Sequence, residues 1–168
     1  MEPQSLSDIS GKTILVAPVD WGMGHATRCA ALIRLLSAHN TLIVGCSSGQ
    51  DFYFGKLFPE LRRIRMPSYG IRYSSILPAY LMVLLQSPRI WKAMRQEKRI
   101  LEDLLSASAL DMVISDCRFG LHSTAVQSVL LTHQLRQIMP FGRYLANWMN
   151  ARLINRFSEI WVPDYELG

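Results

Sequence analysis

The fold is decided by residues 13–40, TILVAPVDWGMGHATRCAALIRLLSAHN. The stretch 13–18 is short, apolar and rich in β-branched residues, which predicts a buried strand. Apolar residues then repeat at helical spacing and predict an amphipathic helix: Cys29, Leu32, Ile33 and Leu36. Between them, residues 20–25 hold two glycines, which let the backbone turn tightly and approach a ligand, while the free N–H groups of the next helix suit a polar oxygen or an anion. We therefore expect a binding site in this loop.

The alternation of strand and helix patterns continues along the chain. Strand patterns recur at 41–46, 61–67, 111–116, 128–134 and 160–163, and helical patterns cover 76–106, in two pieces separated near Pro88, and 141–157. The strand at 61–67 alternates apolar and basic residues, which suits a position near the sheet edge. Strands joined by helical crossovers predict an α/β fold, a Rossmann-like, mostly parallel sheet with helices on both faces.

Length and composition are those of a single folded domain. The chain has 168 residues, of which 49% are hydrophobic and 18% charged. We expect a flexible N-terminal segment at residues 1–12 and one domain over 13–168. The net charge of +5 admits three kinds of partner, namely nucleic acid, an anionic membrane surface or a phosphorylated substrate.

Cysteine usage and the apolar segments indicate where the protein acts. Cys29, Cys46 and Cys117 are far apart and odd in number, so neither a disulfide framework nor a zinc site is predicted, and a reducing cytoplasm is expected. The N-terminal residues lack the basic and apolar regions of a signal peptide. The longest apolar run, 76–85, is interrupted by Pro78 and is shorter than the roughly 20 residues that span a bilayer.

Polar side chains follow four of the predicted strands, where an α/β sheet binds its ligands. They are Asp20 to His25, Ser47 and Ser48, Asp116 to Arg118, and His133 with Gln134. Because parallel strands end at the same edge of a sheet, we expect these groups to converge on one rim.

Several of these residues also have a purely structural interpretation. Asp116 can cap the turn after its strand, and His25 can be an ordinary polar residue in the first helical turn. His133 and Gln134 can satisfy backbone groups at the rim. Arg118 suits a phosphate or a solvated surface position equally well.

A dinucleotide site is the first functional hypothesis. Residues 22–27, GMGHAT, resemble the G-x-G-x-x-G fingerprint with Thr27 in place of the last glycine. The second strand, however, ends in Cys46-Ser47-Ser48, where the fingerprint requires an acidic residue for the ribose. This mismatch disfavours NAD or FAD.

Three segments together support a different hypothesis. VDWGMGHATRCAALIRLL (19–36), ISDCRFG (114–120) and LTHQL (131–135) resemble the matching parts of GT-B glycosyltransferases similar to the peptidoglycan lipid-intermediate N-acetylglucosaminyltransferase. The resemblance extends from Lys12 to Asp164. It implies an N-terminal, acceptor-binding half of an enzyme, in which a C-terminal domain absent from this chain binds most of a nucleotide-sugar. The acceptor contributes a hydroxyl, which is lipid-linked in the peptidoglycan group.

The resemblance also implies roles for individual residues. In related inverting plant-type transferases, a loop histidine removes the proton of the acceptor hydroxyl and an aspartate after the fourth strand orients it; His25 and Asp116 match these positions. The expected substrate-binding residues are Asp20, Gly22, Met23, Gly24, Arg118, His133 and Gln134. No catalytic metal and no cofactor other than the donor substrate is expected. This chain departs from the peptidoglycan-type relatives, whose loop is richer in glycine than DWGMG.

A basic segment lies between Leu61 and Arg99. It holds a single acidic residue, Glu97, and nine basic residues: Arg62, Arg63, Arg65, Arg72, Arg89, Lys92, Arg95, Lys98 and Arg99. With the apolar run and several aromatic residues nearby, the segment suits an anionic membrane surface, which predicts a cytoplasmic protein bound peripherally to the inner face of the membrane. A core helix with a solvated basic face is the alternative. No nucleic-acid-binding motif accompanies the charge.

A non-catalytic module is the rival to an enzyme. The chain would then be the acceptor-binding or membrane-docking subunit of a split transferase. Whether the reading frame continues into a second α/β domain distinguishes the two.

Overall fold

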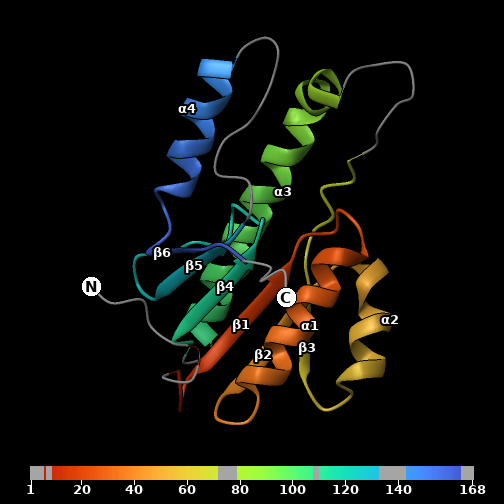
Figure 1. The fold of residues 1–168 in the computed structure, drawn as a ribbon, viewed down its shortest axis with the longest axis vertical. Coiled ribbons are helices and arrows are strands. Elements are labelled where there is room, and N and C mark those ends of the chain that lie inside the picture. Colours follow the sequence, from red (N-terminus) through yellow and green to blue (C-terminus); the bar gives the residue numbers. More distant parts are fainter. Residues whose placement is uncertain (1–5, 7–8, 72–78, 108–109, 133–142, 164–168) are drawn as a thin grey trace, which may run out of the picture.

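A computed structural model describes residues 6, 9–71, 79–107, 110–132 and 143–163, except for a few side chains near the ends of two helices. Within these residues, six parallel strands form one sheet in the order β3-β2-β1-β4-β5-β6 (Figure 1). The strands are β1 (Thr13–Pro18), β2 (Thr41–Cys46), β3 (Arg62–Arg65), β4 (Met112–Asp116), β5 (Gln127–Leu131) and β6 (Glu159–Trp161). The helices are α1 (Met23–Leu36), α2 (Ser48–Leu57), α3 (Ala79–Ala107) and α4 (Arg143–Ile154). The predicted Rossmann-like α/β fold is confirmed.

The alternating side chains of β1 divide the core between the two faces of the sheet. Ile14 and Val16 are fully buried on the face covered by α1 and α2. Leu15 and Ala17 are fully buried on the opposite face, where they share a cluster with Leu101. Helix α3, which carries Leu101, covers this face (Figure 1). Because successive side chains of a strand point to opposite faces, the apolar run of β1 contributes to both halves of the core.

The strands agree with the sequence prediction more closely than the helices do. β1 and β2 have the predicted bounds, and β3 is the predicted edge strand, shortened to four residues of which three are exposed. The other three strands begin or end within a few residues of the prediction.

Helix α2 was absent from the prediction. Residues 47–49, SSG, suggest a turn, but here Ser47 precedes the helix, and its N–H and hydroxyl both donate to Gln50 Oε1 at 3.2 Å. The side-chain Nε2 of Gln50 donates in turn to Val19 O at 3.0 Å. This capping interaction fixes the start of α2 against the end of β1.

The predicted break near Pro88 is wrong, because α3 continues through this residue. An interior proline removes one backbone hydrogen bond and costs a helix about 3 kcal/mol. Beyond Pro88, buried side chains attach the helix to the rest of the fold: Ala93, Met94, Leu101 and Leu104. This burial outweighs the local cost. The first predicted residues of the helix, 76–78, lie outside the described residues.

The folded region begins earlier than residue 13. Ile9, which the sequence assigned to a flexible segment, is 3% exposed and belongs to the core cluster beneath α1. Its carbonyl accepts a hydrogen bond of 2.8 Å from the side chain of Asn40. Among the described residues, no helix combines the length and the hydropathy needed to cross a bilayer.

Candidate functional site

The loop after β1 places the first turn of α1 above the end of β4. Val19 N–H donates to Asp116 O at 2.9 Å, which joins the two strand ends. Gly22 then adopts a φ of 116°, a conformation that side chains with a Cβ rarely reach, and α1 begins at the next residue. His25 therefore lies in the first turn of α1, close to the carboxyl end of the central strands.

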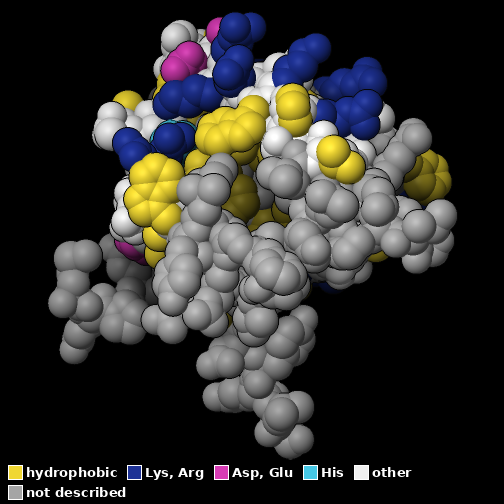
Figure 2. Space-filling model, turned by 90° about the horizontal axis from the view of Figure 1, so that it is seen from above, with side chains coloured by type: hydrophobic (Ala, Val, Ile, Leu, Met, Phe, Trp, Pro, Cys, Tyr) yellow, Lys and Arg dark blue, Asp and Glu magenta, His cyan; other side chains and the backbone are white. Residues whose placement is uncertain are grey.

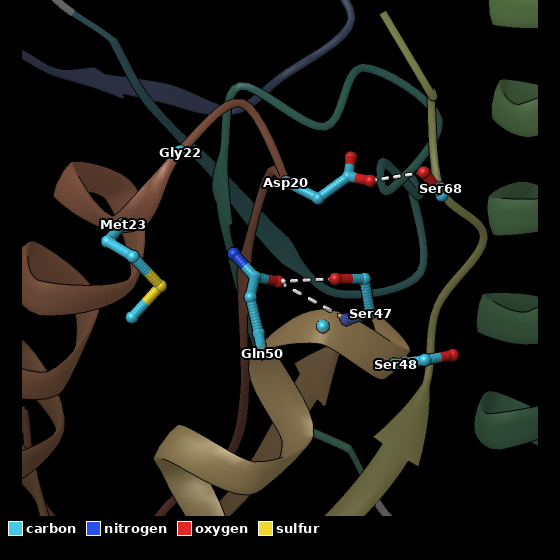
Figure 3. Close-up of a pocket in the computed structure, with 8 residues that line it drawn as sticks. Asp20, Gly22, Met23, Ser47, Ser48, Gln50 and Ser68 are labelled. Atoms are coloured by element: carbon cyan, nitrogen blue, oxygen red, sulfur yellow. Dashed lines mark hydrogen bonds between the residues drawn. The ribbon is translucent and has the colours of Figure 1, made fainter.

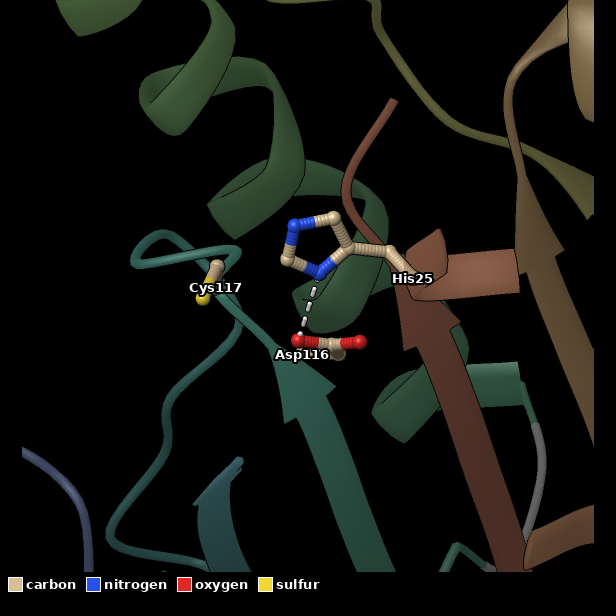
Figure 4. A group of neighbouring side chains, drawn as sticks. All are labelled: His25, Asp116 and Cys117. Carbon is tan, nitrogen blue, oxygen red and sulfur yellow. Dashed lines mark hydrogen bonds and ion pairs between the residues drawn. The ribbon is translucent and has the colours of Figure 1, made fainter. Parts of the chain in front are cut away.

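His25 and Asp116 are in contact, as the resemblance implied. Their Nδ1 and Oδ1 atoms are 3.0 Å apart, and the second ring nitrogen lies on the side of the imidazole away from the carboxylate (Figure 4). Asp116 is fully buried at the end of β4, whereas the side chain of His25 is 15% exposed. A buried carboxylate on one ring nitrogen leaves the other available to a ligand.

The same carboxylate has a second partner that the sequence analysis missed. Arg28 Nη2 lies 2.5 Å from Asp116 Oδ1, and Arg28 Nε donates to Oδ2 at 3.3 Å. Burial lowers the pKa of Arg28, but its hydrogen bond with Asp116 and the charge of that carboxylate outweigh burial and raise it overall. Arg28 follows His25 by three residues, so both occupy one face of the helix, and this spacing is a signal that could have identified it.

The three side chains drawn in Figure 4, His25, Asp116 and Cys117, come close enough together to suggest a metal site. Arg28 already places a permanent cation on the carboxylate that a metal would need. The thiol of Cys117 donates to Leu131 O at 3.6 Å, and burial raises its pKa to about 12, so it is protonated at neutral pH. These donors fit a metal ion poorly.

A pocket of about 440 Å³ opens beside the loop (Figure 3). It is lined by Asp20, Gly22, Met23, Ser47, Ser48, Gly49, Gln50 and Ser68. Asp20 Oδ1 accepts the N–H of Tyr69 at 3.2 Å, and Oδ2 accepts the hydroxyl of Ser68. The carboxylate therefore holds the 68–69 segment against the loop. It also gives the pocket an acceptor for hydroxyl groups and makes it unfavourable for an anion.

Arg118 does not have the expected surface position. Its guanidinium is fully buried and forms an ion pair with Glu97, with Nη1 2.7 Å from Oε1. Nε donates to Pro18 O at 2.7 Å, and Nη1 also donates to Pro67 O at 2.8 Å. Both the phosphate-binding and the solvated interpretation are wrong, because this side chain instead joins β1, α3 and the loop after β3.

The remaining predicted residues are distributed as follows. Gly22 and Met23 line the pocket, and Met23 is 47% exposed. Gly24 lies in the first turn of α1, where its carbonyl accepts the hydroxyl of Thr27 at 3.0 Å. His133 and Gln134 lie outside the described residues, so their assignment to the substrate site stays a prediction.

Comparison with known proteins identifies the architecture. No protein-family model matches the sequence, and no curated protein matches it. Among solved structures, Arabidopsis thaliana UGT89C1 complexed with UDP-L-rhamnose is similar over 94% of this chain and 46% of its own, with a TM-score of 0.63 and 13% identity. The chain has the fold of one half of a GT-B glycosyltransferase.

Two further structures have the same half-domain. A UDP-glucosyltransferase from Polygonum tinctorium matches over 92% of this chain and 47% of its own, with a TM-score of 0.60 and 11% identity. Acinetobacter baumannii MurG matches over 93% of this chain and 42% of its own, with a TM-score of 0.50 and 10% identity. The chain therefore spans less than half the length of each of these GT-B proteins.

Proposed function

We propose that this chain is the N-terminal, acceptor-binding half of an inverting glycosyltransferase, which moves a sugar from a nucleotide-sugar to an acceptor hydroxyl. The observation that carries the proposal is the contact of 3.0 Å between His25 Nδ1 and Asp116 Oδ1 at the carboxyl edge of a GT-B-type sheet. In a Rossmann-like sheet this edge is where ligands bind.

In the proposed reaction, His25 is the general base. Its Nε2 takes the proton of the acceptor hydroxyl while the acceptor oxygen attacks the anomeric carbon of the donor. The bond between that carbon and the nucleotide phosphate breaks, and a nucleoside diphosphate leaves from the opposite side, which inverts the configuration. Asp116 fixes the proton of Nδ1 and stabilises the imidazolium as it forms.

The acceptor is placed in the pocket beside the loop. Its lining includes Gly22, which directly precedes α1, and Met23, the first residue of the helical turn in which His25 lies. Asp20 offers acceptors for hydroxyl groups, and the side chain of Met23 offers an apolar contact. The donor is assigned to a second domain that this chain does not contain.

The proposed reaction uses no catalytic metal. Arg28 supports this assignment, because its guanidinium neutralises Asp116 at 2.5 Å and would repel a divalent cation from the same oxygen. No cofactor is required beyond the nucleotide-sugar, which is a substrate.

The test replaces His25 by alanine in the two-domain enzyme that the proposal implies. Loss of a positioned base costs about 100- to 10,000-fold in turnover. Donor binding should be nearly unchanged, as measured by calorimetry with the nucleotide-sugar. His39→Ala is the matched control, because His39 is exposed after the end of α1. Near-normal turnover of His25→Ala at saturating substrate would refute the base assignment.

Two alternatives predict different results. If the chain is the non-catalytic subunit of a split transferase, turnover requires a separate polypeptide and His25→Ala weakens acceptor binding only. If it is a dinucleotide-binding domain, NAD or FAD should bind to the isolated chain. Against the second alternative, the position after β2 is occupied by Ser47, which is hydrogen-bonded to Gln50 and offers no carboxylate to a ribose.

A peripheral position on an anionic membrane is the second part of the proposal. The exposed face of α3 carries Arg89, Lys92, Arg95 and Arg99. Glu97, the acid nearest to them in sequence, is fully buried and paired with Arg118, so it does not balance their charge. Trp91 and Leu85 are 37% and 63% exposed on the same helix, and Figure 2 shows basic side chains gathered beside hydrophobic ones on this end of the molecule.

Vesicle co-sedimentation tests this position. Each basic residue near an anionic surface contributes about 1 kcal/mol, so Lys92→Glu with Arg95→Glu should reduce binding to anionic vesicles by more than tenfold. Arg34→Glu with Lys56→Glu makes the same charge change on α1 and α2 and should have little effect. The electrostatic argument would fail if both double variants reduced binding to anionic vesicles equally. It would also fail if the unmodified chain bound neutral vesicles as well as anionic ones.

A further inference from the structure

Arg28 is turned inward, unlike the other arginine of α1. Arg34, six residues later, is exposed, whereas the side chain of Arg28 is only 19% exposed and meets the buried carboxylate of Asp116 at two points. A two-point contact between a planar guanidinium and a carboxylate fixes the orientation of both groups. Arg28 therefore fixes the plane of the Asp116 carboxylate beside the imidazole.

Three atoms at the centre of this site form a closed triangle. Arg28 Nη2 is 2.5 Å from Asp116 Oδ1 and 3.1 Å from His25 Nδ1, and Nδ1 is 3.0 Å from the same Oδ1. A guanidinium only donates hydrogen bonds, so it favours a lone pair on Nδ1, whereas the carboxylate favours a proton there. Arg28 and Asp116 thus favour opposite tautomers of His25.

We propose that Arg28 is a positioning residue of this site, which aligns Asp116 to accept a hydrogen bond from the protonated Nδ1 of His25 and limits how strongly that carboxylate stabilises the imidazolium. The carboxylate decides the tautomer, because Arg28 Nη2 lies 2.5 Å from Oδ1 and 3.1 Å from Nδ1, so the guanidinium donates to the carboxylate and leaves the proton on Nδ1. Nε2 then keeps its lone pair. A second proton on the ring would create a cation 3.1 Å from the guanidinium, with one carboxylate shared between two positive charges.

The other ionisable neighbours among the described residues do not change this balance of charge. The thiol of Cys29 lies 3.6 Å from Asp116 Oδ2, and Cys117 is the first residue after β4. Burial raises the pKa of both thiols, to about 12 for Cys117, so both are neutral around pH 7. Among the described residues, the hydrogen bonds and ion pairs of the His25 ring join it to two charged groups, Arg28 and Asp116.

The consequence for catalysis rests on the proposed function. With the proton held on Nδ1 by the carboxylate, Nε2 presents its lone pair to the acceptor hydroxyl. The geometry itself can be examined in the chain without any reaction.

The test is ¹⁵N NMR of the histidine side chains in the isolated chain. The His25 signals are identified by their disappearance in His25→Gln. In the unmodified chain, Nδ1 should carry the proton of the neutral ring. A neutral ring protonated at Nε2 instead would overturn the proposal without any variant of Arg28.

Variants of Arg28 provide the second measurement. Arg28→Gln keeps a donor for Asp116 but removes the charge, and it should raise the titration midpoint of His25 by about one pH unit. Arg28→Lys restores the charge and should return the midpoint close to its original value. Arg34→Gln, the same change on the exposed side of α1, should have no effect. A midpoint that is unchanged or lower in Arg28→Gln would overturn the proposal.

These outcomes are independent of the proposed reaction. If the midpoint shifts but the two-domain enzyme transfers no sugar, Arg28 positions the His25–Asp116 pair for another purpose and the glycosyltransferase assignment fails alone. If transfer is found without a shift, the assignment stands and the role of Arg28 fails alone.

Discussion

Residues Arg118 and Glu97 form an ion pair in which neither side chain is exposed. Glu97 Oε2 also accepts the hydroxyl of Tyr69 at 2.9 Å and the N–H of Gly120 at 3.0 Å. Burial raises the pKa of Glu97, and the charge and hydrogen bonds of Arg118 oppose that rise. A Cβ at Gly120 would lie 2.3 Å from Met94 O, so a glycine is required for this close approach. The cluster fastens α3 to the ends of β1 and β4.

Removing the charge of Glu97 should destabilise the fold strongly. Glu97→Gln leaves the Arg118 guanidinium buried without a counter-charge, and the free energy of unfolding should fall by about 3 kcal/mol. Glu102→Gln is the matched control, since Glu102 is 59% exposed and its contact with Lys98 is 3.8 Å long. An exposed pair contributes less than about 1 kcal/mol. Urea denaturation measures the free energy of unfolding of both variants. If Glu97→Gln lost as little stability as Glu102→Gln, this interpretation of the cluster would be wrong.

At the scale of elements, the loop between β1 and α1 depends on two glycines that have different functions. Gly22 has a φ of 116°, whereas Gly24 lies within α1 and has no neighbour within 4 Å of the position of an added Cβ. Gly22 therefore makes the turn, and Gly24 leaves the surface open above the first helical turn.

Alanine at each glycine should shift stability in opposite directions. Gly22→Ala forces a Cβ into a strained conformation and should lower the free energy of unfolding by about 1–3 kcal/mol. Gly24→Ala replaces a poor helix former and should raise it by about 0.5–1 kcal/mol. Both are read from urea unfolding curves followed by circular dichroism. If Gly24→Ala lowered the free energy of unfolding as much as Gly22→Ala does, the different functions assigned to these two glycines would be wrong.

At the scale of the whole molecule, the described residues complete one sheet with apolar clusters on both faces. The chain spans less than half the length of each of the GT-B structures similar to it. Since the sheet and its covering helices already enclose a core, we expect the chain to fold without a second domain.

The isolated chain should therefore unfold cooperatively but not transfer sugar. Calorimetric titration with common nucleotide-sugars should give weak or no binding, because the proposed donor site belongs to the absent half. Far-ultraviolet circular dichroism provides the control that the chain is folded. Tight binding of a nucleotide-sugar together with sugar transfer by this chain alone would contradict the proposal that a second domain binds the donor.

Some of the candidate site was predictable from the sequence. His25 and Asp116 were placed at strand ends by the alternation of strands and helices, and parallel strands necessarily end at one edge. The pocket was predicted in part: Asp20, Gly22 and Met23 follow β1 and Ser47 and Ser48 follow β2, but Ser68 comes from a loop without any recognisable motif. Its contribution depends on the pairing of β3 with β2, which brings that loop beside the first one.

The sequence by itself determined the strands, the helix α1, the turn at Gly22 and the edge where polar residues meet, because hydrophobic periodicity and glycine conformation are local properties. Only the tertiary structure decided the partners of the two key arginines. Arg28 meets a carboxylate 88 residues away, and Arg118 meets one 21 residues away on another element. In a sequence, an arginine looks the same whether its side chain is solvated or buried in an ion pair. Which of the two occurs depends on whether folding brings a distant acidic partner to it.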